Sequence, residues 1–125
     1  SMFAECEELS KIDLKQTKLD LDKFRKDIES LEQYHDLRRA YDDKYKSYSL
    51  IFKQLKKNAN LFNDMYNEYK QLTDAQEKQN LFEKMKQLYK TRKTQTMQLN
   101  EKYKCLHEEL REIKANVSRF VQSMD

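Results

Sequence analysis

Apolar side chains recur at helical spacing along the C-terminal part of the chain. From Leu81 onward the steps between them alternate between four and three residues, which is the heptad pattern of a helix that packs along one stripe. Two polar residues, Arg92 and Gln95, fall in the same register and interrupt this stripe. Because a buried, unpaired guanidinium is costly, we expect the bundle to open or narrow to two helices there, with the Arg92 charge reaching water or a carboxylate. The apolar members are Leu81, Met85, Leu88, Leu99, Tyr103, Leu106, Leu110, Ile113, Val117, Phe120 and Met124.

A second apolar stripe lies upstream and predicts another long helix over residues 31–72. Its members are Leu37, Tyr41, Tyr45, Tyr48, Phe52, Leu55, Ala59, Phe62, Met65, Tyr69 and Leu72. Between the two stripes, Thr73 and Gln76 have the spacing of a capping box, which marks the start of a helix. The chain should therefore turn near Thr73 and Asp74 into an antiparallel hairpin. The pairs expected across it are Leu99 with Tyr48, Leu106 with Tyr41, and Met85 with Phe62.

The segment before the hairpin carries a shorter stripe and predicts an N-terminal helix over residues 3–30. Ser30 and Gln33 form a second, weaker capping box at its end, although the stripe could also run on into one longer helix. A two-helix ribbon buries each stripe on one side only, so a third helix should pack across the pair. The predicted fold is all-α: an elongated antiparallel three-helix bundle, dominated by a long helical hairpin over residues 31–124, in one domain. We expect a monomer; a dimeric coiled coil that buries the same seam between two chains is the alternative.

Composition narrows the choice of fold further. The chain of 125 residues has 0 Gly and 0 Pro, which argues against the tight turns of sandwiches and barrels and against glycine-rich phosphate loops. Charged residues make up 38%, but the 8 Tyr and 6 Phe favour burial over disorder. No apolar run is longer than three residues, so we expect no membrane insertion. The two cysteines are too few for a disulfide scaffold, so we expect an intracellular protein. The opening Ser1-Met2 is typical of residues left by cloning.

Positive charge gathers in one part of the chain. The formal net charge is +3, yet residues 78–104 hold eight basic and two acidic side chains and alone contribute +6. Such a band attracts acidic partners at low salt, although a lysine-rich stretch can also be a solvated helix face. Within this band two aromatic residues lie just off the apolar stripe, where they could widen the core or serve as exposed anchors. The partner-binding residues predicted here are Phe82, Lys84, Lys86, Tyr89, Lys90 and Lys93.

Candidate catalytic and metal-binding residues are few. Cys105 and His107 point to different faces of a helix and cannot bind one metal ion, and Cys6 and Cys105 are expected to be reduced, packed thiols. Without loops to bring a nucleophile and a base together, we predict no enzymatic activity, no metal site and no cofactor. Tyr41, Tyr45 and Tyr48 could stack on nucleobases, but their place on the stripe favours core packing, and we do not expect nucleic acid as the partner.

Two stretches of the sequence carry a family resemblance. The first is Tyr45-x-x-Tyr48-x-x-Ile51-x-x-x-Leu55 with its continuation through Phe62, Met65 and Leu72 to Gln79-Asn80 and Tyr89. The second is Glu101-Lys102-Tyr103-Lys104-Cys105, followed by Leu106-His107-x-x-Leu110-x-x-Ile113-Lys114 and Phe120. Over residues 38–122 the chain resembles the occludin/ELL homology domain of occludin, tricellulin and ELL-type RNA polymerase II elongation factors. It departs from that pattern in having neither proline nor glycine at the helical turn and in being two residues shorter after Cys105.

The resemblance implies a hairpin-dominated helical bundle that binds other proteins and performs no chemistry. Tyr103-Lys104-Cys105 is closer to the elongation-factor version, which favours a nuclear docking domain of an ELL-like transcription elongation factor. The alternatives are a scaffold-binding tail of an occludin- or tricellulin-like tight-junction protein, on the cytoplasmic face of a cell junction, and a generic coiled-coil or spectrin-like segment. Partners are expected to be proteins with acidic or amphipathic segments.

Overall fold

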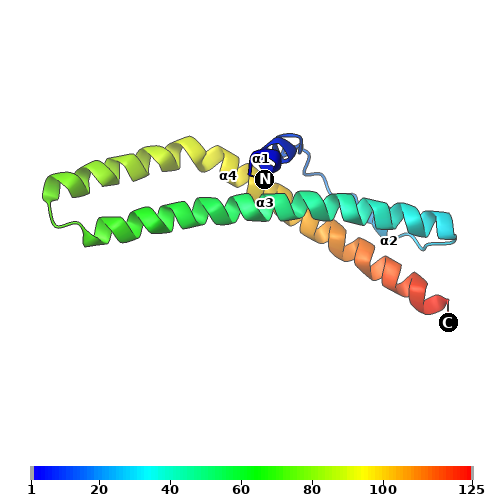
Figure 1. Cartoon of the computed structure of the whole chain (residues 1–125). Helices are drawn as coiled ribbons and strands as arrows, with labels where there is room; N and C mark the ends of the chain where they lie inside the picture. Colours follow the sequence, from blue (N-terminus) through cyan, green and yellow to red (C-terminus); the bar gives the residue numbers. More distant parts are fainter. Residues whose placement is uncertain (1, 125) are drawn as a thin grey trace.

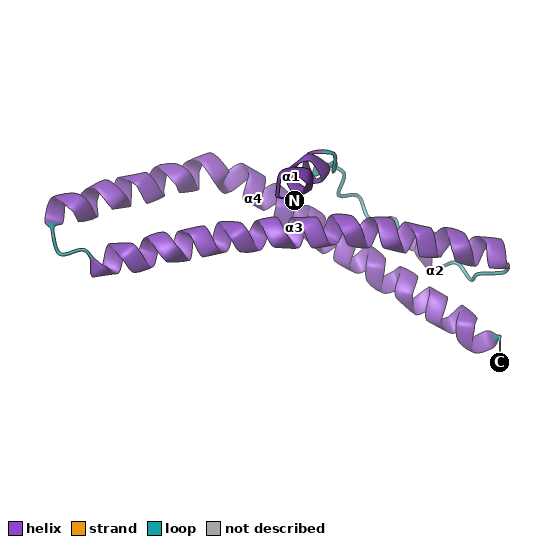
Figure 2. Cartoon of the chain, viewed as in Figure 1, coloured by secondary structure: helices purple, strands orange, loops and turns teal. Residues whose placement is uncertain are grey.

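The computed structural model describes residues 2–124, and the regular elements of this part are all helices (Figure 1). These helices are α1 (Met2–Ser10), α2 (Leu21–Arg25), α3 (Leu31–Gln71) and α4 (Ala75–Ser123). Figure 2 shows α3 and α4 as two long helices joined by a short loop, and α1 packs on α3 while α2 packs on α4. The predicted all-α fold dominated by a long hairpin is confirmed. Ser1, the first residue of the pair attributed to cloning, lies outside the described residues.

Polar side chains cap the start of each long helix. The hydroxyl of Ser30 accepts a hydrogen bond from the Gln33 amide, as expected, while the Gln33 side chain accepts one from the amide of Glu29. At α4 the cap is Asp74, whose carboxylate accepts from the Glu77 amide at 2.8 Å. The predicted box that starts at Thr73 is therefore wrong by one residue. Aspartate is a stronger cap than threonine, and its negative charge is favourable at a helix N-terminus.

The turn between α3 and α4 forms without glycine because it is extended. Leu72 and Asp74, at its two ends, have φ values of −71° and −75° and ψ values in the extended region. No residue of the described chain has a positive φ. A three-residue extended connection therefore reverses the chain with backbone angles that any residue adopts.

The register of the hairpin differs from the predicted one by about one turn of α4. The ring of Tyr48 stacks on Tyr103, four residues beyond the expected Leu99, and Phe62 meets Tyr89 instead of Met85. Leu106, expected to face Tyr41, packs in a core cluster with Ile51 and Leu99. The physical reason is that every Cα–Cβ bond tilts toward its own helix N-terminus. In an antiparallel pair the side chains lean in opposite directions, so contacting residues are offset along the axis.

The prediction of one continuous N-terminal helix over residues 3–30 is wrong, because two short helices and an irregular connector take its place. Ile12 and Leu14 both pack on the core cluster, which residues two apart cannot do from one helix. Backbone carbonyls of this segment are bound by α4 instead. The Lys102 ammonium donates to the carbonyl oxygen of Gln16 at 2.7 Å, and the buried Asn116 amide donates to those of Phe24 and Lys26, both at 2.7 Å.

The core is concentrated where the N-terminal segment covers the hairpin. Ile51, Leu99 and Leu106 form its centre, and Leu9, Ile12 and Leu14 pack against it. Beyond this region the hairpin consists of two helices alone, as Figure 1 shows, and we call residues 58–97 the distal arm. Only Asn58 and Met65 are buried in the distal arm. Arg92 lies within it, so the expected narrowing of the bundle around this residue is observed.

Candidate protein-interaction surface

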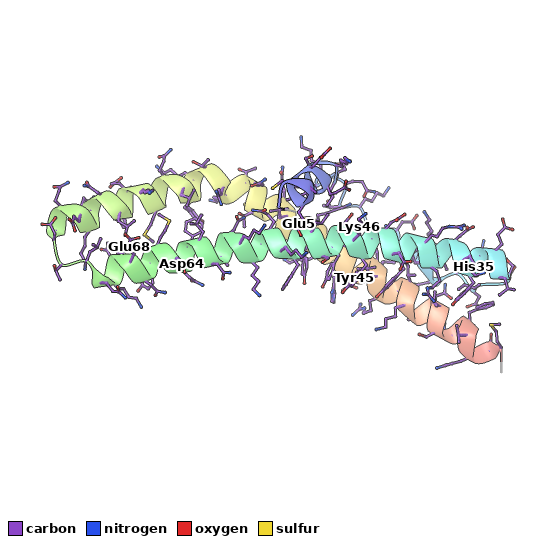
Figure 3. The ribbon with its side chains drawn as sticks, in the orientation of Figure 1. Glu5, His35, Tyr45, Lys46, Asp64 and Glu68 are labelled. Atoms are coloured by element: carbon purple, nitrogen blue, oxygen red, sulfur yellow. The ribbon has the colours of Figure 1, made fainter. Side chains whose placement is uncertain are left out.

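Two grooves run between α3 and α4 along the distal arm. The first, about 600 Å³ in volume, is walled by Leu55, Ala59 and Phe62 of α3 and by Tyr89, Lys93 and Met97 of α4. It also contains Arg92, and we call it the Arg92 groove. The second, about 540 Å³, is lined by residues that include Met65, Glu68, Lys84 and Leu88, and we call it the Lys84 groove. Glu68 is labelled near the turn in Figure 3. Both grooves exist because a two-helix ribbon leaves the edges of its apolar seam uncovered.

The six predicted partner-binding residues do not form one patch. Tyr89 and Lys93 lie together in the Arg92 groove, with the Lys93 ammonium 6.0 Å from the centre of the Tyr89 ring. Phe82 is about two helical turns from Tyr89 on α4 and contacts Tyr69 of α3. Lys84 lines the other groove. Lys86 and Lys90 are exposed and line neither of the two grooves.

Phe82 and Tyr89 are each packed on α3 and also partly exposed. Each ring contacts an aromatic residue of α3 with a centroid distance of 6.5 Å, Phe82 with Tyr69 and Tyr89 with Phe62. Yet Phe82 remains 47% exposed and Tyr89 56% exposed. They extend the seam at one edge and leave about half of each side chain available to a partner.

Arg92 binds an amide of α3, a partner that the sequence pattern did not predict. Its guanidinium donates to Oδ1 of Asn58 at 3.1 Å, and the Gln54 side chain donates to the same oxygen at 3.0 Å. Nδ2 of Asn58 is buried and has no hydrogen-bond partner in the described chain, a state that costs about 1–3 kcal/mol. The signal was present in the sequence: Asn58 continues a heptad series from Ile51 through Leu55 and so faces the seam.

We expect Arg92→Leu to leave the fold intact. The change removes one hydrogen bond to Asn58, whose Oδ1 keeps Gln54 as a donor, so the free energy of unfolding should change by no more than about 1 kcal/mol. The double variant Asn58→Leu/Arg92→Leu should be more stable than the parent by about 1–2 kcal/mol, because it replaces polar groups of the seam by apolar ones. Urea unfolding followed by far-UV circular dichroism measures both. A loss of several kcal/mol in the single variant would show that the Asn58–Arg92 pair is essential to the fold.

Comparison with known families agrees with this architecture. A family model for the occludin homology domain matches residues 25–122. The chain belongs to this family. The resemblance seen in the sequence is thereby confirmed, and the matched region extends farther toward the N-terminus than residue 38. No curated protein and no solved structure matches the chain.

Two tyrosines of this occludin homology domain, Tyr48 of α3 and Tyr103 of α4, are stacked and hydrogen-bonded to each other. The Tyr48 hydroxyl donates to that of Tyr103 at 2.8 Å and lies 3.1 Å from Nδ1 of His107. The hydrogen bond to Tyr103 and partial burial raise the pKa of Tyr48 to about 12. Tyr41 and Tyr48 are half-buried as predicted, but Tyr45 is 53% exposed, so the prediction of core packing is wrong for this residue. Tyr45 stacks on Tyr41 instead, with the ring centroids 6.1 Å apart.

Ion pairs attach the N-terminal segment to the domain. Glu5 of α1 is paired with Lys53 at 3.2 Å and with Lys57 at 4.0 Å, and Figure 3 labels it where α1 meets α3. Its hydrogen bond from Lys53 lowers the pKa of Glu5. At α2, a hydrogen bond from Arg25 at 3.1 Å lowers the pKa of the Glu112 carboxyl. These contacts are solvated, so they orient the two short helices more than they stabilise the fold.

The two cysteines have different surroundings. Cys105 is buried, and burial together with the neighbouring Glu109 carboxylate raises the pKa of its thiol, which keeps it unreactive. Cys6 is exposed, so the expectation of a packed thiol is wrong for α1. Among residues 2–124 we find no cluster of three or more potential metal ligands. None of the helices in the described chain is both long and apolar enough to cross a membrane.

Proposed function

We propose that this occludin homology domain is a non-enzymatic docking module that binds a protein partner through the distal arm of its hairpin. The observation that carries the proposal is the pair of half-exposed rings, Phe82 and Tyr89, within a band of lysines on a part of the hairpin that no third helix covers. Half-buried aromatic residues are the usual anchors of protein interfaces. The lysines around them steer an acidic partner into place.

We further propose that the module belongs to an ELL-type transcription elongation factor and works in the nucleus as a monomer. The support is the Tyr103-Lys104-Cys105 stretch, which is closer to the elongation-factor version of the family than to the junction version. The rival proposal is a scaffold-binding tail of a tight-junction protein. The full-length sequence separates the two, since a junction protein has membrane spans upstream of the domain.

The surface is tested with a charge-reversal variant and an anchor variant. Proteins captured from a nuclear extract by the wild-type chain supply the partner, and surface plasmon resonance then measures its rates. Lys86→Glu/Lys90→Glu should slow association by about ten- to a hundredfold, and added salt should mimic the effect on the wild type. Phe82→Ala should mainly speed dissociation, by about tenfold or more, because it removes a half-exposed ring that the partner would cover.

The matched control is Lys15→Glu/Lys18→Glu, which changes the charge equally on the exposed connector before α2. It should bind like the wild type. A partner that responds equally to both double variants, or to neither, would contradict docking on the distal arm. Micromolar binding of duplex or single-stranded oligonucleotides at 150 mM salt, with an affinity that falls steeply as salt rises, would favour nucleic acid instead.

A further inference from the structure

The Arg92 groove contains two hydrogen-bond donors that the chain itself does not satisfy. Asn58 is 5% exposed, and its orientation is settled because Oδ1 accepts from both Gln54 and Arg92, which leaves Nδ2 as the unpartnered donor. Arg92 uses one of its five N–H groups on Asn58 and takes part in none of the ion pairs within residues 2–124. A half-buried guanidinium therefore stands in the groove without a carboxylate.

The walls of the groove indicate which ligand chemistry it fits. The groove is lined by Leu55, Phe62 and other apolar side chains, and its charged members are Arg92 and Lys93. No acidic residue lines it, whereas the Lys84 groove has Glu68 beside its lysine. An occupant should therefore present apolar side chains to the walls and one negative charge to Arg92.

The chain already binds a segment of this kind on the neighbouring part of α3. Helix α1 is acidic, with Glu5, Glu7 and Glu8 and no basic residue, and it packs on α3. Its Leu9 packs against the core cluster while Glu5 pairs with Lys53 and Lys57. An acidic amphipathic helix thus fits the surface of this hairpin both in shape and in charge.

We propose that the Arg92 groove binds an amphipathic helix of a partner protein and that Arg92 and Asn58 together recognise one Glu or Asp carboxylate within its apolar face. Arg92 and Asn58 are hydrogen-bonded to each other and both line the groove, so a carboxylate that binds Arg92 lies next to Asn58 and has an acceptor site for Nδ2 once the helix uncovers this buried atom. Apolar walls suit aliphatic side chains better than a hydrated phosphate backbone, so a protein helix is the occupant. The inference rests on the proposed docking function and specifies the chemistry of the partner.

The test is a selection of peptides on the full 125-residue chain. The probe is a phage-displayed library of amphipathic helical peptides of about 20 residues, with apolar residues at every third or fourth position and the residues between them randomised. We expect Glu or Asp to be enriched at one position flanked by apolar residues. Replacing that residue by Gln or Asn in the selected peptide should weaken its binding to the wild type about ten- to a hundredfold, measured by fluorescence anisotropy at 150 mM salt.

The same replacement of the acidic residue in the peptide should change its affinity for the Arg92→Leu and Arg92→Gln variants by less than about threefold. Arg92→Gln retains an amide near Asn58. Two Arg92 variants are used so that a folding defect in one, detected by circular dichroism, does not decide the result. Lys18→Leu removes an exposed cation of the connector before α2, outside the groove and outside the lysine band of the distal arm, and is the matched control, which should keep the full acid preference.

The outcomes separate the inference from the proposed function. The inference is overturned, and the docking function stands, if the selected peptides bind the distal arm and lose affinity on Phe82→Ala but show no preference for an acidic residue. The same conclusion follows if these peptides bind the Arg92 variants as tightly as the wild type. Failure to enrich any helical peptide overturns the inference alone, whereas oligonucleotide binding at 150 mM salt that requires Arg92 overturns both.

Discussion

Replacing Leu110 by alanine is expected to lower the free energy of unfolding by about 2–5 kcal/mol. Leu110 is only 7% exposed on the part of α4 where most of the buried residues are found. The change removes buried methyl groups and leaves a cavity that two long, stiff helices cannot close. Chemical unfolding followed by far-UV circular dichroism measures the loss.

The matched control for this prediction is Leu31→Ala, which removes the same groups from a side chain that is 57% exposed. It should cost less than about 1 kcal/mol, since little apolar area returns to water. Equal losses in the two variants would contradict the burial of Leu110. A stable dimer in sedimentation experiments that dissociates in the Leu110→Ala variant would indicate that the seam is buried between chains instead.

Asn116→Asp is expected to be at least as disruptive, although it changes the shape of the side chain very little. The Asn116 amide is 1% exposed and donates to the carbonyl oxygens of Phe24 and Lys26. A carboxylate in its place has no proton to donate and faces two oxygen atoms. The loss should be on the order of 3–5 kcal/mol at neutral pH, with α2 released from α4.

This loss should depend on pH in a direction that identifies its cause. Burial beside two carbonyl oxygens raises the pKa of the introduced carboxyl in the folded state above its unfolded value of about 3.9. The folded state therefore favours the protonated form, and the deficit relative to wild type shrinks as pH falls toward the unfolded pKa. Unfolding at about pH 7 and about pH 4.5, with wild type measured in parallel, should show this recovery. Asn63→Asp, an exposed control on α3, should show neither the loss nor the recovery.

The two long helices and their antiparallel arrangement were determined by local sequence. The apolar stripes have the period of a helix, and Ser30 and Asp74 supply caps where the stripes begin. These are interactions between neighbouring residues in the chain, so periodicity and capping rules capture them. The family resemblance was readable for a related reason, because its motifs include buried seam positions such as Ile51, Leu106 and Ile113.

The register of the hairpin and the path of the N-terminal segment were decided by tertiary contacts. The tilt of Cβ atoms in two antiparallel helices sets Tyr48 against Tyr103. Counting residues from the turn pairs Tyr48 with Leu99 instead, because the count ignores this tilt. The N-terminal segment does not continue as one helix because side chains from a distant part of the chain bind its backbone carbonyls: Lys102 binds that of Gln16 in the connector, and Asn116 binds two at the end of α2. The same holds for the Arg92 groove. In the sequence Arg92 reads as a polar interruption of its stripe and Asn58 stands next to the stripe position given to Ala59, so only the packing of α3 on α4 joins them into one site with a donor left unpaired.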